Sequence, residues 1–117
     1  MIPVILVVDD DRSMRDSVAK TLERKTYSVL QAPDAAAAMT IIAEKEIDVV
    51  ISDIRMPGLT GHDLLREVKR KSPETEVILL TAFATVESAL EAMKDGAFDY
   101  LTKPIPGGPE AVEVVVE

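Results

Sequence analysis

The stretch that decides the fold is Val-Ile-Leu-Val-Val-Asp-Asp-Asp, residues 4–11, in which five apolar residues run directly into three aspartates. An apolar run without polar alternation is typical of a parallel strand that is buried on both faces. Similar short runs recur at residues 49–51 and 77–80, and weaker strand candidates lie at residues 28–32 and 98–101. We therefore expect five strands in one parallel sheet.

Segments in which apolar residues recur at helical spacing lie between the strand candidates. Their apolar positions are Met14, Val18 and Leu22; Ala38, Ile41 and Ile42; Leu64, Leu65 and Val68; and Val86, Ala89, Leu90 and Met93. Asp34 and Thr85 stand at expected N-caps, and Gly96 stands where a helix end favours left-handed backbone. Strict alternation of strand and helix predicts an α/β fold, with right-handed crossovers and helices on both faces of the sheet in three layers.

The composition limits the class of protein. A chain of 117 residues with 47% hydrophobic content can form one domain with a real core. It has no cysteine, which excludes disulfides and thiolate metal sites. The first residues lack the basic segment of a signal peptide and form too short a run to span a membrane, so we expect a cytoplasmic protein. Acidic residues outnumber basic ones 21 to 13, and the net charge of −8 argues against direct binding of nucleic acid.

The C-terminal segment departs from the regular alternation. Residues 1–105 form the predicted folded core, and residues 106–117 form an atypical end. Two prolines and a glycine pair follow Lys103-Pro104, and the valines after them are β-branched, which lowers their helix propensity. We expect this end to be a short or truncated fifth helix, or an extended arm.

Polar and charged residues follow four of the predicted strands. They are Asp9, Asp10 and Asp11 after the first strand, Asp53 after the third, Thr81 after the fourth and Lys103 after the fifth. In a parallel α/β sheet, ligands bind outside the carboxyl ends of the strands, so these residues are expected at one crevice. Such convergence favours a functional site over a merely soluble surface.

The chemistry of these residues indicates phosphoryl transfer. Clustered carboxylates repel one another unless a cation holds them, and a small set of aspartate oxygens suits Mg²⁺. A lysine beside the cation adds positive charge for a phosphoryl group. A carboxylate can also serve as the nucleophile and form an aspartyl phosphate. Asp53 is the best candidate, because it ends a buried strand and precedes a loop at residues 55–58 that can fold over it.

Four segments together resemble the response-regulator receiver domains over about residues 4 to 105. They are Val-Val-Asp-Asp-Asp (7–11), Ser-Asp-Ile-Arg-Met-Pro-Gly-Leu-Thr-Gly (52–61), Leu-Leu-Thr-Ala (79–82) and Gly-Ala-Phe-Asp-Tyr-Leu-Thr-Lys-Pro (96–104). The resemblance implies a flavodoxin-like (βα)5 fold with strand order 2-1-3-4-5 and a phosphoacceptor role in two-component signalling. The second and fourth segments are most similar to receivers of nitrogen-regulation-type, sigma-54-dependent transcriptional activators.

The resemblance also implies a metal site and a phosphorylation site. It makes Asp53 the phosphoacceptor and a Mg²⁺ ligand, Asp10 a direct ligand, Asp9 a water-mediated one, and the Arg55 backbone carbonyl a further ligand. In the same way, Lys103 would contact the phosphoryl oxygens.

Two further residues are assigned to a switch by the resemblance. Thr81 would move to hydrogen-bond the phosphoryl group, and Tyr100 would follow it inward, which repacks the surface near the fourth helix. Read alone, Thr81 is a strand-end hydroxyl and Tyr100 an aromatic residue at the edge of the core.

The implied partners are a sensor histidine kinase, and output ATPase and DNA-binding domains in a longer parent chain. The domain would be regulatory rather than an enzyme, apart from its own phosphotransfer and autodephosphorylation. The atypical tail replaces the fifth helix that contributes to a dimer face in many relatives, so homodimerisation stays open.

Plainer interpretations apply to three other residues. Asp11 is read as a capping or first-turn carboxylate as readily as a site residue. His62 is read as an exposed residue near a helix start, and the Arg55 side chain as solvated. Thr60-Gly61, where many relatives have Asp-Gly, is read as a tolerated turn change.

Two other classes of function require residues that this sequence does not have at the necessary positions. A phosphatase with an aspartate nucleophile needs a second acid two residues later, where Arg55 stands, and a nucleotide-binding domain needs a glycine-rich loop after the first strand. The remaining alternative is a receiver-like interaction module that works without phosphorylation. Its mark would be loss of Asp53, Asp10 or Lys103, and all three are present.

Overall fold

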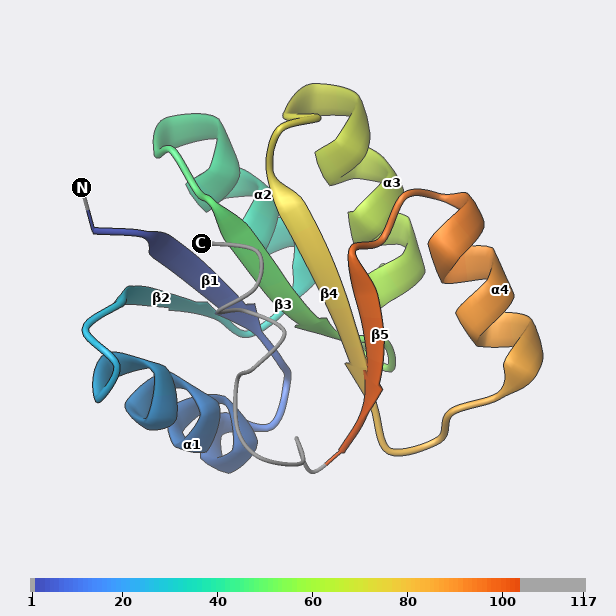
Figure 1. Ribbon diagram of the computed structural model, residues 1–117, viewed down its shortest axis with the longest axis horizontal. Helices are drawn as coiled ribbons and strands as arrows, with labels where there is room; N and C mark the ends of the chain where they lie inside the picture. The colour runs from blue at the N-terminus through green and yellow to red at the C-terminus, as the bar shows by residue number, and fades with distance from the viewer. Residues whose placement is uncertain (1, 104–117) are drawn as a thin grey trace.

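The computed structural model describes residues 2–103, which form a five-stranded parallel sheet with helices on both faces (Figure 1). The strand order is β2-β1-β3-β4-β5, as expected. The strands are β1 (Val4–Val8), β2 (Ser28–Ala32), β3 (Val49–Asp53), β4 (Glu76–Thr81) and β5 (Asp99–Thr102).

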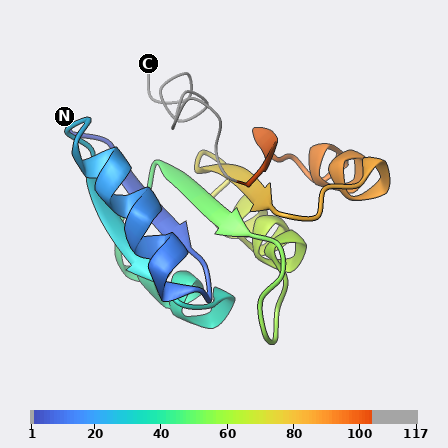
Figure 2. The same cartoon turned by 90° about the horizontal axis from the view of Figure 1, so that it is seen from below.

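Four helices alternate with the strands. They are α1 (Arg12–Glu23), α2 (Ala35–Glu44), α3 (Gly61–Lys71) and α4 (Val86–Lys94). Seen from below, α1 covers one face of the sheet while the other three helices lie on the opposite face (Figure 2). The predicted α/β class and three-layer arrangement are thus confirmed.

The apolar residues of each strand point alternately to the two faces, as a strand requires. In β1, Ile5 and Val7 join the core beneath α1, whereas Leu6 and Val8 join the core shared with α2, α3 and α4. All four are buried. Full burial of a side chain of this kind contributes about 1.5–3 kcal/mol relative to exposure, so the unbroken apolar run of β1 holds both layers to the sheet.

The helices begin at the residues that the sequence indicated. Asp34 caps α2, and Thr85 caps α4, each through a side-chain oxygen that accepts a backbone N–H. Asp11 caps α1 by accepting from the Met14 N–H, which agrees with its interpretation as a cap. Gly96 follows α4 with a φ of 97°, a left-handed geometry that glycine adopts without steric cost.

The C-terminal segment that was predicted as a fifth helix or an arm lies outside the described residues, and so does the predicted end of the core at residue 105. Among residues 2–103, no helix combines the length and the apolar character that a membrane crossing needs.

Candidate functional site

Three aspartates gather at the carboxyl end of the sheet. Asp9 and Asp10 come directly after β1, and Asp53 is the last residue of β3, the strand that pairs with β1. A carboxylate oxygen of each lies within 4.8 Å of those of the other two. Asp9 and Asp53 are 3% and 8% exposed, whereas Asp10 is open to solvent. The chain thus offers a compact set of oxygen donors that can be reached from outside.

Lys103 brings a positive charge to the same place. Its Nζ lies 2.9 Å from Asp9 Oδ2 and 3.4 Å from Asp53 Oδ1. Its backbone N–H donates to the Thr81 carbonyl oxygen at 2.8 Å, one residue beyond β5. This bond carries the β4–β5 pairing past the end of β5, and it fixes the direction from which the side chain reaches the aspartates.

The charges at the site shift each other's protonation. Burial raises the pKa of the Asp53 carboxyl, and the charge of Asp9 raises it further; the charge and hydrogen bond of Lys103 and a hydrogen bond from the Arg55 backbone oppose this without cancelling it. Burial alone would lower the pKa of Lys103, but its hydrogen bond to Asp9 and the charges of both carboxylates raise it. One ammonium therefore accompanies a cluster of three carboxylates, and the excess negative charge favours a bound cation.

The carboxylates fit a hard divalent cation such as Mg²⁺. Carboxylate oxygens completed by water are the ligands that Mg²⁺ uses in proteins, and the exposed Asp10 leaves a path for water and ligand. No nitrogen or sulfur ligand accompanies the three aspartates in the described part of the chain, which disfavours zinc.

Asp9 is held on both of its carboxylate oxygens. Oδ1 accepts the Asp11 N–H at 2.9 Å, and Oδ2 accepts from Lys103. Arg15 also donates to the Asp9 backbone carbonyl at 2.7 Å. Asp9 is therefore the most constrained carboxylate of the three.

The start of α3 approaches the site closely at Gly61, which the sequence did not reveal. A Cβ on Gly61 would lie 2.5 Å from the Asp53 backbone oxygen, too near for any other residue without a shift of the backbone. Gly61 N–H also donates to the Ile54 carbonyl at 2.9 Å. Thr60 caps α3 in a capping box with Asp63, so Thr60-Gly61 sets both the start of α3 and its distance from Asp53.

The last residue of β4, Thr81, carries the hydroxyl that the resemblance assigns to a switch. Thr81 is buried at the end of β4, one residue beyond Leu80, the register partner of Asp53. Its Oγ1 accepts the Phe83 N–H at 3.1 Å, the local backbone bond expected of a strand-end hydroxyl. The Phe83 ring is exposed, and the Arg55 guanidinium lies 4.4 Å from its centroid. The Arg55 side chain, expected to be merely solvated, thus joins the two loops.

Tyr100 lies on β5, and its ring packs against the core shared with α3 and α4. Its hydroxyl is buried and makes no hydrogen bond with any of residues 2–103. A buried hydroxyl left without a hydrogen bond costs about 1–3 kcal/mol.

The prediction that His62 is exposed is wrong. His62 is only 9% exposed and lies against Ser88 and Glu91 of α4. Its Nε2 forms a hydrogen bond of 2.9 Å with Ser88 Oγ on α4. The sequence could not show this, since the burial of a helix's first turn depends on where the next helix lies.

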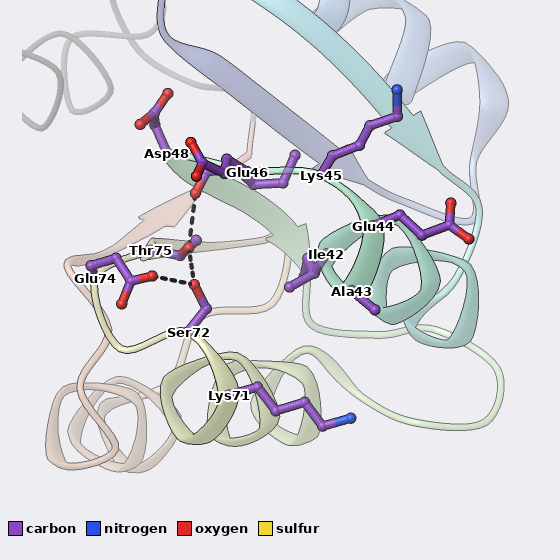
Figure 3. A pocket seen from close by; sticks show the side chains of 11 residues that line it. Ile42, Ala43, Glu44, Lys45, Glu46, Asp48, Lys71, Ser72, Glu74 and Thr75 are labelled. Carbon is purple, nitrogen blue, oxygen red and sulfur yellow. Dashed lines mark hydrogen bonds between the residues drawn. The ribbon is translucent and has the colours of Figure 1, made fainter.

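A hollow of about 550 Å³ lies at the opposite edge of the sheet (Figure 3). It is bordered by the ends of α2 and α3 and by the residues that lead into β3 and β4. Thr75, at its wall, donates to the Ile47 carbonyl at 2.8 Å and shares a bond of 2.7 Å with Ser72. Ser72 Oγ also donates to Glu74 Oε1 at 3.1 Å, and none of the three aspartates of the site lines this hollow.

The sequence matches the family described as the response regulator receiver domain over residues 5–114. Among curated relatives, the response regulator protein FleR of Pseudomonas aeruginosa is 40% identical over 100 residues. The DNA-binding transcriptional regulator NtrC of Escherichia coli is 39% identical over 101 residues. Each match covers 86% of this chain but 21% and 22% of the relative, so the chain spans about a fifth of their length.

Solved structures agree with the sequence relatives. A response regulator receiver domain protein from Clostridium thermocellum superposes with a TM-score of 0.86 at 38% identity, over 98% of this chain and 90% of that chain. The predicted similarity to the receivers of nitrogen-regulation-type activators is confirmed by the match to NtrC. With the fold, strand order and motifs in agreement, the chain belongs to the response regulator receiver domains of two-component signalling systems.

Proposed function

We propose that this chain is a phosphoacceptor in which Asp53 takes a phosphoryl group from a sensor histidine kinase in a Mg²⁺-dependent reaction. The observation that carries the proposal is the gathering of Asp53, Asp9 and Asp10 with oxygens within 4.8 Å of one another, and of Lys103 Nζ at 3.4 Å from Asp53. The role is regulatory, and the chain acts as a catalyst only in its own phosphotransfer and autodephosphorylation.

The proposed metal ligands are Asp10, Asp53 and the Arg55 backbone carbonyl, with Asp9 acting through water. The indirect role of Asp9 is supported by its hydrogen bonds, because both of its carboxylate oxygens already accept from other groups of the chain. When bound, Mg²⁺ supplies positive charge next to the phosphoryl oxygens. Asp10 is exposed and is the carboxylate best placed to meet an arriving ion.

The chemical step is an attack by an Asp53 carboxylate oxygen on the phosphorus of the donor phosphohistidine. The new oxygen–phosphorus bond forms as the nitrogen–phosphorus bond breaks, and the electron pair of that bond returns to the imidazole. Lys103 is already held beside Asp53, so its ammonium can pair with the phosphoryl oxygens without a large movement. The reaction would thus exchange the Lys103–Asp53 contact for a Lys103–phosphoryl contact.

The proposed switch involves Thr81 and Tyr100. A phosphoryl group adds about two negative charges and three acceptor oxygens next to the Thr81 hydroxyl, which now accepts from Phe83. A donated hydrogen bond from Thr81 to the phosphoryl group would shift the β4–α4 loop. Tyr100, whose buried hydroxyl has no partner in the described residues, would then be free to find one.

The proposed setting is a longer cytoplasmic regulator. FleR is a response regulator, and NtrC is a DNA-binding transcriptional regulator, and this chain matches about a fifth of each. We place output ATPase and DNA-binding domains in the same parent chain, with this domain as their regulatory input. The net charge of −8 makes direct contact between this domain and DNA unfavourable.

The test is phosphorylation by acetyl phosphate with Mg²⁺, followed by intact mass measurement, for the wild type and for Asp53→Ala. Asp16→Ala is the matched control, since Asp16 lies on α1 and its surface pair with Arg12 is long, at 3.8 Å. We expect a base-labile adduct on the wild type and the control, lost with EDTA and absent from Asp53→Ala. Beryllofluoride should shift the amide signals near Thr81 and Tyr100 in the same two proteins.

A folded wild type that takes neither adduct nor beryllofluoride would contradict the proposal. The alternative would then be an interaction module that works without phosphorylation. An adduct that survives in Asp53→Ala would move the phosphoacceptor to another carboxylate.

A further inference from the structure

Helix α4 has little apolar attachment to the rest of the chain. Of its nine residues, all of them described, Ala92 is the one that is buried. Val86, Leu90 and Met93 are 76%, 65% and 50% exposed. Helices in proteins draw most of their stability from packing of an apolar face, so α4 needs another source of attachment.

His62 supplies part of that attachment from the first turn of α3, which lies beside α4 (Figure 1). Its Nε2 bonds to Ser88 Oγ at 2.9 Å, and its Nδ1 faces Glu91 Oε2 at 3.3 Å. Nδ1 is buried and, within residues 2–103, makes no hydrogen bond, so Glu91 lies close to it without hydrogen-bond alignment. Ser88 and Glu91 are three residues apart and therefore share one face of α4.

Arg66 continues the attachment one turn further along α3. Its Nη1 lies 3.1 Å from Asp95 Oδ2 and 3.4 Å from Glu91 Oε2, and its Nη2 lies 2.6 Å from Asp63 Oδ1. Each of these surface ion pairs is weak alone, but Arg66 joins three carboxylates and shares Glu91 with His62. Polar contacts from α3 thus reach Ser88 and Glu91 of α4 and its C-cap residue, Asp95.

The start of α4 is tied to the switch loop. Thr81 ends β4 and Thr85 caps α4, so three residues, 82–84, separate them. Thr85 accepts the Ser88 N–H at 3.0 Å, and Ser88 is the residue that His62 holds. A displacement at Thr81 therefore reaches the His62–Ser88 contact through one short loop and one turn of helix.

We propose that His62 and Arg66 form a polar clamp that holds α4 in the position seen in this structure and thereby opposes the switch. The proposal rests on the phosphoacceptor function above and names the contacts that regulate it. Contacts made in one state and lost in the other shift the balance between the two states. Because coupling is reciprocal, release of the clamp must raise the affinity of the Asp53 site for a phosphoryl group or its mimic.

The test compares Arg66→Ala, His62→Leu and Glu91→Ala with Arg70→Ala as the matched control. Arg70 lies one turn beyond Arg66 on α3 and pairs with Glu67 of the same helix at 2.8 Å. The measurement is the dissociation constant of beryllofluoride in the presence of Mg²⁺, from amide chemical shifts. We expect about five- to tenfold tighter binding in the three clamp variants and no change in the control.

Amide hydrogen exchange of residues 86–94 in the free proteins gives a second readout. It should speed up in the clamp variants and stay unchanged in Arg70→Ala. The change in exchange rate caused by Arg66→Ala together with Glu91→Ala should be smaller than the sum of the two single changes. Both substitutions remove the same Arg66–Glu91 contact, so their effects are not additive. A purely structural role would loosen α4 without tightening beryllofluoride binding, so the direction of the affinity change distinguishes the two roles.

Equal or weaker beryllofluoride binding in folded clamp variants would overturn the clamp while the phosphoacceptor function stands. If His62→Leu fails to fold, the exposed Arg66 and Glu91 variants decide. A folded wild type that binds no beryllofluoride would overturn the phosphoacceptor function and the regulatory role together. The exchange of residues 86–94 would then still show whether these side chains hold α4.

Discussion

Helices α3 and α4 lie side by side on one face of the sheet, yet they are attached to it in different ways (Figure 1). Helix α3 buries Leu64, Leu65 and Val68 completely and begins with a capping box. Helix α4 buries Ala92 and leaves three large apolar side chains exposed. Helix α3 is thus fixed by core packing, and α4 is fixed by polar contacts to α3.

The difference gives the two helices different parts in a switch. Protein stability is not uniform, and the elements that move are drawn from its weakly held parts. The loops that lead to α3 and α4 both begin at the carboxylate site, after Asp53 and after Thr81. When a phosphoryl group adds charge at Asp53, we therefore expect α3 to stay in place and α4 to move.

The largest expected effect is the contrast between Leu64→Ala and Leu90→Ala. Leu64 is fully buried on α3, so its truncation should lower the free energy of unfolding by about 2–5 kcal/mol. Leu90 is 65% exposed on α4, and its truncation should change that free energy by less than about 0.5 kcal/mol. Urea unfolding followed by circular dichroism measures both. Similar losses from the two variants would contradict the contrast between the helices.

A smaller effect is expected at the site from which both loops begin. The folded-state pKa of Asp53 is raised, above all by burial, so the ionised carboxylate is less stable in the folded chain than in the unfolded one. The contribution of protonated Asp53 to the free energy of unfolding is complete below the pKa that Asp53 has in the unfolded chain. It is lost as the pH rises through the higher pKa that Asp53 has in the folded chain. Asp53→Asn should therefore unfold at higher urea concentration than the wild type at pH 7 without Mg²⁺.

The urea midpoints at pH 7 and at pH 3 test that sign. The gain of Asp53→Asn should vanish at pH 3, where the carboxyl is protonated in both states, and should shrink at pH 7 when Mg²⁺ binds the wild type. Asp16→Asn on α1 is the control and should show no comparable gain. A wild type more stable than Asp53→Asn at pH 7 without metal would mean that Lys103 outweighs the burial of this carboxylate.

Features fixed by local chemistry were predictable from the sequence. Asp34 and Thr85 were expected as caps because an N-cap depends on its own side chain and the next turn. The prediction of where the strands end was less accurate. Ser52 and Asp53 belong to β3 although the apolar run stops at residue 51, since the backbone pairing with β4 continues through polar residues.

The gathering of the site residues was also predictable, because each follows a parallel strand and such ends share one edge. The roles assigned to Asp53, Lys103, Thr81 and Tyr100 remain predictions. The burial of His62 and the close approach of Gly61 to Asp53 could not be foreseen. Both depend on the distance between elements that are far apart in the sequence, which neither periodicity nor motif spacing reports.

The smallest expected effect concerns the contact that joins the loop before α3 to the loop before α4. The Arg55 guanidinium lies 4.4 Å from the centroid of the exposed Phe83 ring, and such a pair at a surface contributes about 0.5–1 kcal/mol. A double-mutant cycle of Arg55→Ala and Phe83→Ala should return a coupling energy of that size in urea unfolding. The same cycle on Arg12 and Phe83 is the control and should return none. A coupling near zero for Arg55 and Phe83 would mean that the loops move independently, and the firm attachment of α3 would then not extend to the entry of α4.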